Sequence, residues 1–355
     1  MSSDKLKNFD PNSPGLKNNN IFGLPFSEEE SELIIIPVPW EVTVSYRQGT
    51  SRGPEQILEA SFQVDLFDPD PALRDNWKKG FHMISLDKNI RNKSDYLRSC
   101  AELIIGCLYE GSPVQENGQL CTKLQEVNEG GKFLHDWLHD ISSRYLKMGK
   151  KIAILGGDHS TPLGYIKALS EQYQSFGLLQ IDAHADLRKT YEGFKYSHAS
   201  IMYNVLQEIP EVKKLVQVGV RDFCDEEYNM IQQQPERIKT FFDQDIKEAQ
   251  YNGANWADIV EQIVKELPET IYISFDIDGL DPKLCPNTGT PVPGGFDLEQ
   301  VFFLLKKIHE KGKKIIGFDL NEVSSGAHGH DCIDPIVGAR TLFKLCSYLV
   351  SSSVH

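Results

Sequence analysis

Three short segments of the chain concentrate carboxylate and imidazole side chains. They read LGGDHS, which ends at Ser160, IDAHADLR, which ends at Arg188, and SFDIDGLDP, which ends at Pro282. Each follows an apolar stretch that is typical of a buried strand. Strand ends of an open parallel sheet form its ligand crevice, so ionisable groups there are expected to be functional. Six of these groups are candidate metal ligands: His159, Asp182, His184, Asp186, Asp276 and Asp278.

The spacing of these groups supports a metal site. Alternate residues of an extended chain point the same way, so Asp182, His184 and Asp186 can share one side, and Asp276 and Asp278 repeat the pattern. So many acids in one low-dielectric crevice could not all stay ionised without a compensating positive charge. Helix caps, turns and buried ion pairs would explain any one motif, but they do not explain three together.

The ligand types indicate the metal and its chemistry. Carboxylates and imidazoles without sulfur suit Mn²⁺, and also Ni²⁺, Co²⁺ or Zn²⁺. Six ligands, of which two or more are carboxylates able to bridge, predict two divalent ions about 3.5 Å apart. Such a pair lowers the pKa of a bridging water and yields a hydroxide nucleophile near neutral pH. The sequence therefore predicts a metal-dependent hydrolase.

The elements that must position these residues alternate between strands and helices. Apolar runs predict strands at residues 33–38, 152–155, 177–181, 215–220, 240–242, 271–275 and 315–319. Amphipathic stretches predict helices at residues 101–109, 133–148, 160–173, 256–266 and 298–310. This alternation predicts an α/β fold with one parallel sheet that is covered by helices on both faces.

The chain divides into a short polar segment and one large domain. Residues 1–28 are rich in Asn, Ser, Pro and Lys, and we expect them to form an N-terminal arm that is mobile or pinned onto a neighbour. Residues 29–355 form the expected catalytic domain, with a helical insertion at about residues 97–149. Gly156 and Gly157 lead into Asp158 and His159 rather than a third glycine, which disfavours a Rossmann dehydrogenase.

The composition excludes several other classes of protein. The formal net charge is −14 and no Lys/Arg run is present, which argues against a nucleic-acid partner and suits a small cationic substrate. Seven cysteines without a Cys-x-x-Cys pair argue against a disulfide framework and a thiolate zinc site. The polar N-terminus and the lack of an apolar run of about 20 residues predict a cytoplasmic protein with no membrane segment.

The three motifs together resemble those of the ureohydrolase family, which includes arginase, agmatinase and formimidoylglutamase. The resemblance covers about residues 31–346 and extends to RQGTSRGP at 47–54, YSHAS at 196–200, TGTPVPGG at 288–295 and VGARTLFKL from Val337. It implies a single three-layer α/β/α domain around an eight-stranded, mostly parallel sheet. It also implies assembly into a homotrimer or homohexamer.

The resemblance assigns a role to each ligand position. Asp182 and Asp276 match the carboxylates that bridge the two ions. His159 and Asp186 complete one metal site, and His184 and Asp278 complete the other. The implied reaction is attack of the bridging hydroxide on the amidino carbon, after which urea leaves with an amine or ammonia.

The resemblance also implies catalytic residues beside the metal ligands. Asp186 matches the group that passes a proton to the leaving nitrogen, and His198 matches a proton-shuttling histidine at the cleft mouth. Glu322, in FDLNEVS, matches the carboxylate that grips the substrate guanidinium. A carboxylate can accept two parallel N–H bonds from that planar cation.

The substrate is left open between several relatives. The segment LRKTYEGFKYSHAS lacks the Asn-containing stretch of arginases and looks more like the agmatinase branch. The arm, the stretch PVPWEVTVSY with Trp40 and the helical insertion are similar to enzymes that hydrolyse free guanidine, sometimes with nickel. Arg188 fits a formimidoylglutamase, where it would meet a substrate carboxylate. We therefore expect Trp40, Arg188, His198 and Glu322 to bind substrate. The alternative to an enzyme is a non-catalytic relative that only binds metal.

Four further histidines carry less weight. His135 and His139 lie one helical turn apart without a third ligand in a charged helix, so we expect them at the surface. His328 and His330, in the loop after Glu322, are expected at the rim of the site.

Overall fold

Eight parallel strands form one sheet in the computed structural model, which describes residues 6–13, 15–18, 20–326 and 332–352. The sheet order is β2-β1-β3-β8-β7-β4-β5-β6, and each neighbouring pair is parallel. The strands are β1 (Leu33–Val38), β2 (Phe81–Met83), β3 (Lys151–Gly156), β4 (Phe176–Ile181), β5 (Val212–Val218), β6 (Ile238–Phe241), β7 (Thr270–Asp276) and β8 (Lys314–Asn321).

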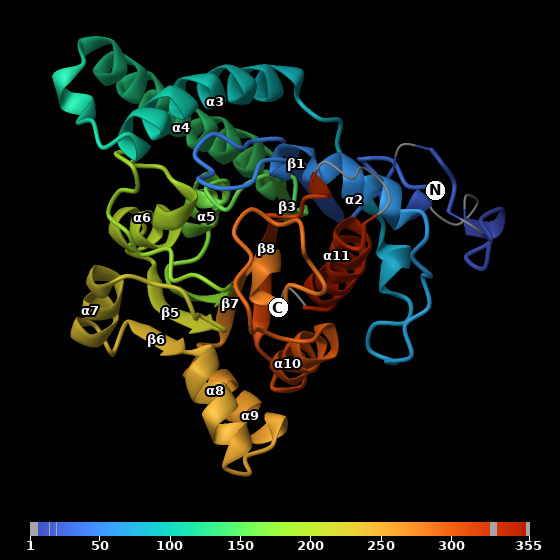
Figure 1. The fold of residues 1–355 in the computed structure, drawn as a ribbon. Helices are drawn as coiled ribbons and strands as arrows, with labels where there is room; N and C mark the ends of the chain where they lie inside the picture. The colour runs from blue at the N-terminus through green and yellow to red at the C-terminus, as the bar shows by residue number, and fades with distance from the viewer. Residues whose placement is uncertain (1–5, 14, 19, 327–331, 353–355) are drawn as a thin grey trace.

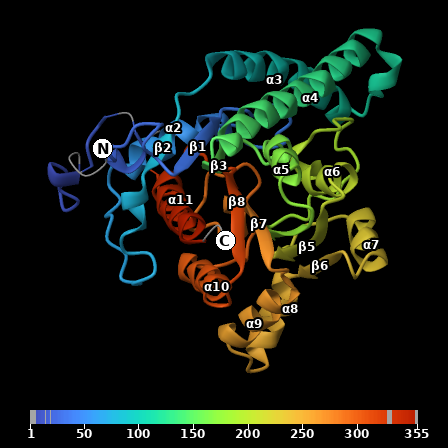
Figure 2. The same cartoon turned by 180° about the vertical axis from the view of Figure 1, so that it is seen from behind.

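Helices cover both faces of this sheet and make three layers (Figures 1 and 2). Their bounds are α2 (Gly53–Ser61), α3 (Lys88–Tyr109), α4 (Gly118–Lys147), α5 (Leu163–Ser170), α6 (Ile201–Glu208), α7 (Asp225–Gln233), α8 (Asp243–Tyr251), α9 (Trp256–Glu266), α10 (Leu298–Glu310) and α11 (Asp334–Ser351). Apolar side chains of α2, α9, α10 and α11 pack on one face, and those of α3, α4, α5 and α6 pack on the other.

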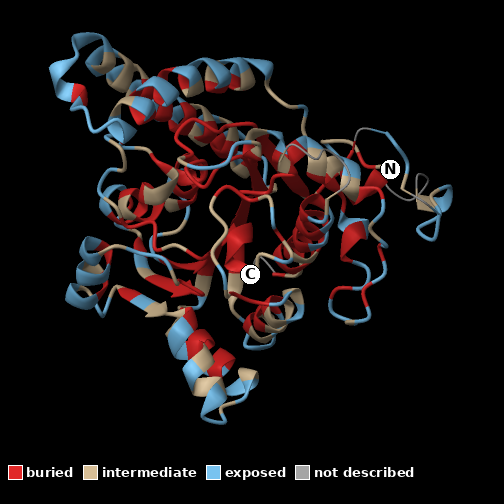
Figure 3. Cartoon of the chain, viewed as in Figure 1, coloured by how far each residue is buried: buried red, intermediate tan, exposed pale blue. Residues whose placement is uncertain are grey.

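The alternation of side chains along each strand explains why most strand residues are apolar. On β1, Leu33 and Ile35 belong to one core cluster, whereas Ile34 and Ile36 belong to the other. Side chains of a strand point alternately to the two faces, so a sheet with two covered faces buries every position. The central strands are accordingly buried along almost their whole length (Figure 3).

The predicted α/β fold with a mostly parallel eight-stranded sheet is confirmed. Seven of its strands lie within a few residues of their predicted positions, but β2 was not predicted because three residues carry no clear periodicity. Helix α3 begins at Lys88, where the Asp87 side chain accepts hydrogen bonds from the backbone of Asn89 and Ile90. It is therefore longer than the 101–109 prediction.

The polar N-terminal segment contributes to the core at its C-terminal end. Ile21, Phe22, Leu24 and Phe26 are all buried, and the ring of Phe22 lies 5.1 Å from that of Phe343 in α11. The apolar letters IFGLPF account for this packing, which differs from the expected mobile or neighbour-pinned arm. Among the described helices, none is both long enough and apolar enough to cross a bilayer.

Candidate metal centre

The predicted ligands and Glu322 lie at or just after the carboxyl ends of four adjacent strands, β3, β8, β7 and β4. His159 lies in the turn after β3, Asp182 directly follows β4, Asp276 ends β7, and Glu322 directly follows β8. Because parallel strands end at the same edge of a sheet, residues far apart in the sequence meet there. Gly157 makes the first turn feasible, since a Cβ at this position would lie 2.1 Å from the carbonyl oxygen of Trp40.

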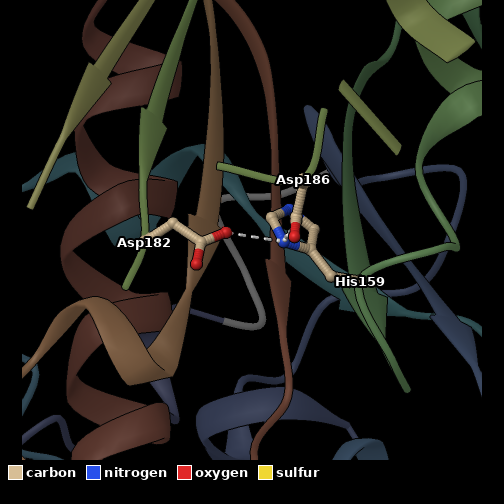
Figure 4. Close-up of side chains that lie close together, drawn as sticks. All are labelled: His159, Asp182 and Asp186. Carbon is tan, nitrogen blue, oxygen red and sulfur yellow. Dashed lines mark ion pairs between the residues drawn. The ribbon is translucent and has the colours of Figure 1, made fainter. Parts of the chain in front are cut away.

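Three carboxylates surround one ring nitrogen of His159, and Figure 4 shows two of them, those of Asp182 and Asp186. The His159 Nδ1 atom lies 3.0 Å from Asp182 Oδ2, 3.0 Å from Asp186 Oδ2 and 3.2 Å from Asp276 Oδ2. His159, Asp182 and Asp276 are almost completely buried, and so is Asp186. His159, Asp182 and Asp186 thus form a group that could hold a metal ion.

A second group shares Asp182 with the first. The His184 Nδ1 atom lies 3.1 Å from Asp278 Oδ2 and 3.5 Å from Asp182 Oδ1. Asp182 therefore presents one carboxylate oxygen to each group, which is the arrangement of a bridging ligand. Asp276 presents Oδ2 to His159 and accepts the backbone N–H of Asp278 with Oδ1.

The other ring nitrogen of His159 shows that a cation fits this cluster. His159 Nε2 lies 2.8 Å from Ser274 Oγ, and Ser274 donates its own proton to Asp319 at 3.0 Å. The Ser274 oxygen is then an acceptor, so the proton of a neutral His159 ring is on Nε2 and Nδ1 carries a lone pair. That lone pair faces carboxylate oxygens, and Nδ1 is buried without a hydrogen-bond partner. An assembly of acceptors of this kind fits a divalent cation.

The ionisation of the carboxylates supports the same conclusion. Burial, together with the charge of Asp182, raises the pKa of Asp186 to about 7. Burial and the neighbouring Asp278 and Asp182 also raise the pKa of Asp276 well above its usual range. Without a metal, part of this cluster must therefore hold protons at neutral pH.

Two ionisable residues of the site have left-handed backbone. Asp186 has a φ of 54° and Glu322 has a φ of 63°. This conformation costs about 1–3 kcal/mol for a residue other than glycine, and such strain concentrates at functional sites. At Asp186 the strained turn is held by its carbonyl oxygen, which accepts the backbone N–H groups of Met202 and Tyr203.

A cavity of about 290 Å³ opens beside the cluster. The residues that line it are Ser45, Tyr46, His184, Asp186, Arg188, Tyr191, His198, Ala199, Asp222, Phe223, Glu227, Thr290, Pro291 and Val292. The metal-group residues His184 and Asp186 form part of its wall, so a ligand in the cavity would lie against them. Aromatic rings and a few charged groups form the rest, as is common in small-molecule sites.

His198 and Arg188 both line this cavity, and their contact with substrate stays a prediction. Burial, with the nearby His184 and His159, lowers the pKa of His198 to about 3, so its ring is neutral at physiological pH. The guanidinium of Arg188 lies over the Tyr191 ring at 5.0 Å, and its Nε lies 3.6 Å from the buried carboxylate of Glu227.

Glu322 and Trp40 do not line the cavity. Glu322 is 4% exposed; its Oε1 accepts the backbone N–H of His159 at 2.9 Å, whereas Oε2 is buried without a hydrogen-bond partner. Trp40 is 2% exposed, packs in the core and is not among the residues that line the cavity. This differs from its expected role; its backbone instead supports the turn before His159 by accepting the N–H of Asp158.

The prediction that His135 lies at the surface is wrong. His135 is buried beside the Tyr196 ring, and burial lowers its pKa to about 3. The cause is the close crossing of α4 and α5, where Gly164 packs directly against the His135 backbone.

His139 is partly exposed and lies 2.7 Å from Glu171. His328 and His330 lie outside the described residues.

Several residues that support the site were not predicted from the sequence. The cavity is also lined by Tyr46 and Tyr191 from loops and by Glu227 from α7. The sequence around these residues has no periodic pattern that indicates ligand binding. Gln180 and Ser274 lie two residues before Asp182 and Asp276 on the same sides of their strands. Polar residues at these buried positions were a signal that could have been used.

Comparisons with known proteins agree with this geometry. The sequence profile described as the Arginase family matches residues 31–346. The N(1)-aminopropylagmatine ureohydrolase of Thermus thermophilus is 29% identical over 303 residues, which cover 85% of this chain and 86% of that protein. The agmatinase of Bacillus anthracis is 26% identical over 319 residues, which cover 88% and 90%.

Solved structures show the same fold. The proclavaminate amidino hydrolase of Streptomyces clavuligerus superposes with a TM-score of 0.71 at 20% identity, covering 96% of this chain and 100% of that chain. The formiminoglutamase of Trypanosoma cruzi gives a TM-score of 0.66 at 13% identity, with 93% and 96% covered. At these identities the likeness concerns the fold.

The raised pKa values lead to a prediction about metal binding. Because the pKa of Asp186 is raised to about 7 and that of Asp276 is raised well above its usual range, bound Mn²⁺ must displace protons, so its affinity should rise from pH about 6 to pH about 8. Isothermal titration of the metal-free protein in buffers of different ionisation enthalpy measures both the affinity and the proton release. Equal affinity across this range, with no protons released, would contradict the crowded cluster.

Proposed function

This chain belongs to the arginase family and is a ureohydrolase, and from that premise we propose that it hydrolyses a small guanidino compound at a pair of divalent ions, releasing urea with an amine or ammonia. The observation that carries this proposal is the shared carboxylate of Asp182, with one oxygen toward His159 and the other toward His184. A single-metal site would not require two histidine groups joined by one carboxylate.

The proposed ligands divide into two sets. His159 and Asp186 would hold one ion, and His184 and Asp278 the other, with Asp182 common to both. Asp276, which lies against His159, would complete the pair. Mn²⁺ suits these oxygen and nitrogen ligands best, and Ni²⁺ fits them too. When bound, the two ions would activate water for attack on the amidino carbon of the substrate.

The residues around the ions would bind substrate and move protons. Glu322 has one buried carboxylate oxygen without a partner, which would accept an N–H of the guanidinium. Asp186 faces both the metal group and the cavity, so its carboxylate would carry a proton to the leaving nitrogen. His198 lies in the same cavity wall, where its imidazole would relay that proton toward solvent.

The assay that tests this proposal compares substrates in parallel. Urea release from agmatine, guanidine, arginine and guanidinobutyrate, and formamide release from formimidoylglutamate, are measured with protein reconstituted with Mn²⁺ or Ni²⁺. We expect urea from agmatine or from guanidine. Asp278→Ala removes one proposed metal ligand and serves as the inactive variant. It should fold, as judged by circular dichroism, and lose more than roughly 100-fold in activity. No urea from any guanidino compound, or an active Asp278→Ala protein, would contradict the proposal.

A carboxylate-bearing substrate is the second candidate, and Arg188 favours it. The Arg188 guanidinium lies in the cavity wall beside Asp186, within reach of a bound ligand. Its partner Glu227 is already engaged, because its oxygens accept the backbone N–H groups of Leu187 and Cys224 at 2.9 Å. Arg188 would thus attract a substrate carboxylate and repel an amine tail.

The variant Arg188→Ala separates the two candidates. If the substrate is guanidine or agmatine, the variant should keep kcat/KM for guanidine within about threefold and should not weaken agmatine turnover, because no favourable contact is lost. A charge-assisted hydrogen bond to a carboxylate is worth about 1.5–3 kcal/mol, or roughly 10- to 100-fold in kcat/KM. A loss of that size for guanidinobutyrate or formimidoylglutamate would favour the second candidate.

Assembly into a homotrimer or homohexamer stays a prediction.

A further inference from the structure

A row of polar side chains crosses the sheet beside the metal centre, at the level of Gln180 and Ser274, which lie two residues before Asp182 and Asp276. Sheet register pairs Thr240 with Gln217, Gln217 with Gln180, Gln180 with Ser274, and Ser274 with Asp319. Gln217, Gln180, Ser274 and Asp319 are fully buried, although most other buried residues of their strands are apolar. Burial of polar groups is costly unless every donor and acceptor has a partner. The row therefore calls for an explanation.

The half of the row on β6, β5 and β4 forms a directed chain of hydrogen bonds. Thr240 Oγ1 donates to Gln217 Oε1 at 2.7 Å, Gln217 Nε2 donates to Gln180 Oε1 at 2.6 Å, and Gln180 Nε2 donates to Asp182 Oδ2 at 2.8 Å. Gln217 Nε2 also donates to the carbonyl oxygen of Ala185 at 2.7 Å.

The direction of this chain is fixed from both ends. The carbonyl oxygen of Ala185 can only accept, so it sets the orientation of the Gln217 amide, which then sets the orientation of the Gln180 amide. The carboxylate of Asp182 also only accepts when ionised, and it requires the same orientation of Gln180. No alternative arrangement of the two amides satisfies all of these groups.

The chain acts on the carboxylate that the two metal groups share. Asp182 Oδ1 accepts the backbone N–H of His184 at 2.6 Å, and Oδ2 accepts Gln180 Nε2. Each oxygen thus has one donor from the protein, and each also faces one of the two histidines. With both oxygens held, the carboxylate cannot rotate about its last torsion angle.

We propose that Gln180 and Gln217 are positioning residues that orient the Asp182 carboxylate so that it serves both metal ions. This inference rests on the proposed two-metal function. Glutamine suits the position because it supplies an N–H donor without a charge, which leaves the charge of Asp182 available for the metals. Residues that orient metal ligands typically alter metal affinity by 10- to 100-fold when they are replaced.

Two neutral variants and one matched control test the inference. Gln180→Met removes the donor to Asp182 and leaves Gln217 Nε2 bonded to Ala185, while Gln217→Met removes the group that orients Gln180. Gln232→Met is the control, because Gln232 lies exposed in α7. Mn²⁺ affinity and stoichiometry are measured by calorimetry on metal-free protein, and the magnetic coupling of the two ions is followed by electron paramagnetic resonance.

We expect Gln180→Met to lose roughly 10- to 100-fold in Mn²⁺ affinity and to show altered coupling between the ions. Gln217→Met should show a smaller loss, and Gln232→Met should match the wild type. Unchanged affinity and coupling in Gln180→Met would overturn the inference. Loss of the fold in both variants would also overturn it, because the row would then hold the strands together. A wild-type protein that does not bind two ions would instead count against the proposed function.

Discussion

The packing of several carboxylates around a buried imidazole is the constraint on which the rest of the site depends. Three carboxylate oxygens lie within 3.2 Å of His159 Nδ1, and all four side chains are buried from solvent. Coulomb repulsion between such charges is strong where the dielectric constant is low, so the cluster needs either protons or cations. Divalent ions would satisfy all of these acceptors at once and would stabilise the cluster in its ionised form.

The fold supplies what this constraint requires. Neighbouring parallel strands bring His159, Asp182, Asp276 and Glu322 to one edge of the sheet, and the helices on both faces bury that edge. The strained backbone at Asp186 and Glu322 is stabilised by the packing around it. Two residues before Asp182 and Asp276, buried polar side chains lie in sheet register, and Gln180 donates a hydrogen bond to the Asp182 carboxylate. The strand ends therefore set both the position and the orientation of the ligands.

The strands and the clustering of acids and histidines at their ends were predictable from the sequence because both depend on local patterns. Apolar runs specify buried strands, and the alternation in IDAHADLR and SFDIDGLDP places acids on one side of the chain. What the sequence could not specify depends on contacts between distant segments. Trp40 is buried in a core cluster that also contains residues of α3 and α4, His135 lies where α5 closely approaches α4, and β2 is a strand because it pairs with β1.

The cavity shows the same limit. Tyr191 and Glu227 reach it from segments that carry no metal-ligand motif, and Arg188 is held between them. Family membership fixes the class of reaction, whereas the substrate depends on these cavity residues. The charge of Arg188 is the feature of the wall that most directly distinguishes a substrate with an anionic tail from one with a cationic tail.

The central claim is that one chain holds two metal ions joined by Asp182. Crystals grown with Mn²⁺ and measured for anomalous scattering at the manganese absorption edge test it most directly. We predict two peaks per chain, one bonded to His159 and Asp186 and the other to His184 and Asp278, with Asp182 bonded to both. A single peak, or two peaks that do not share Asp182, would contradict the claim.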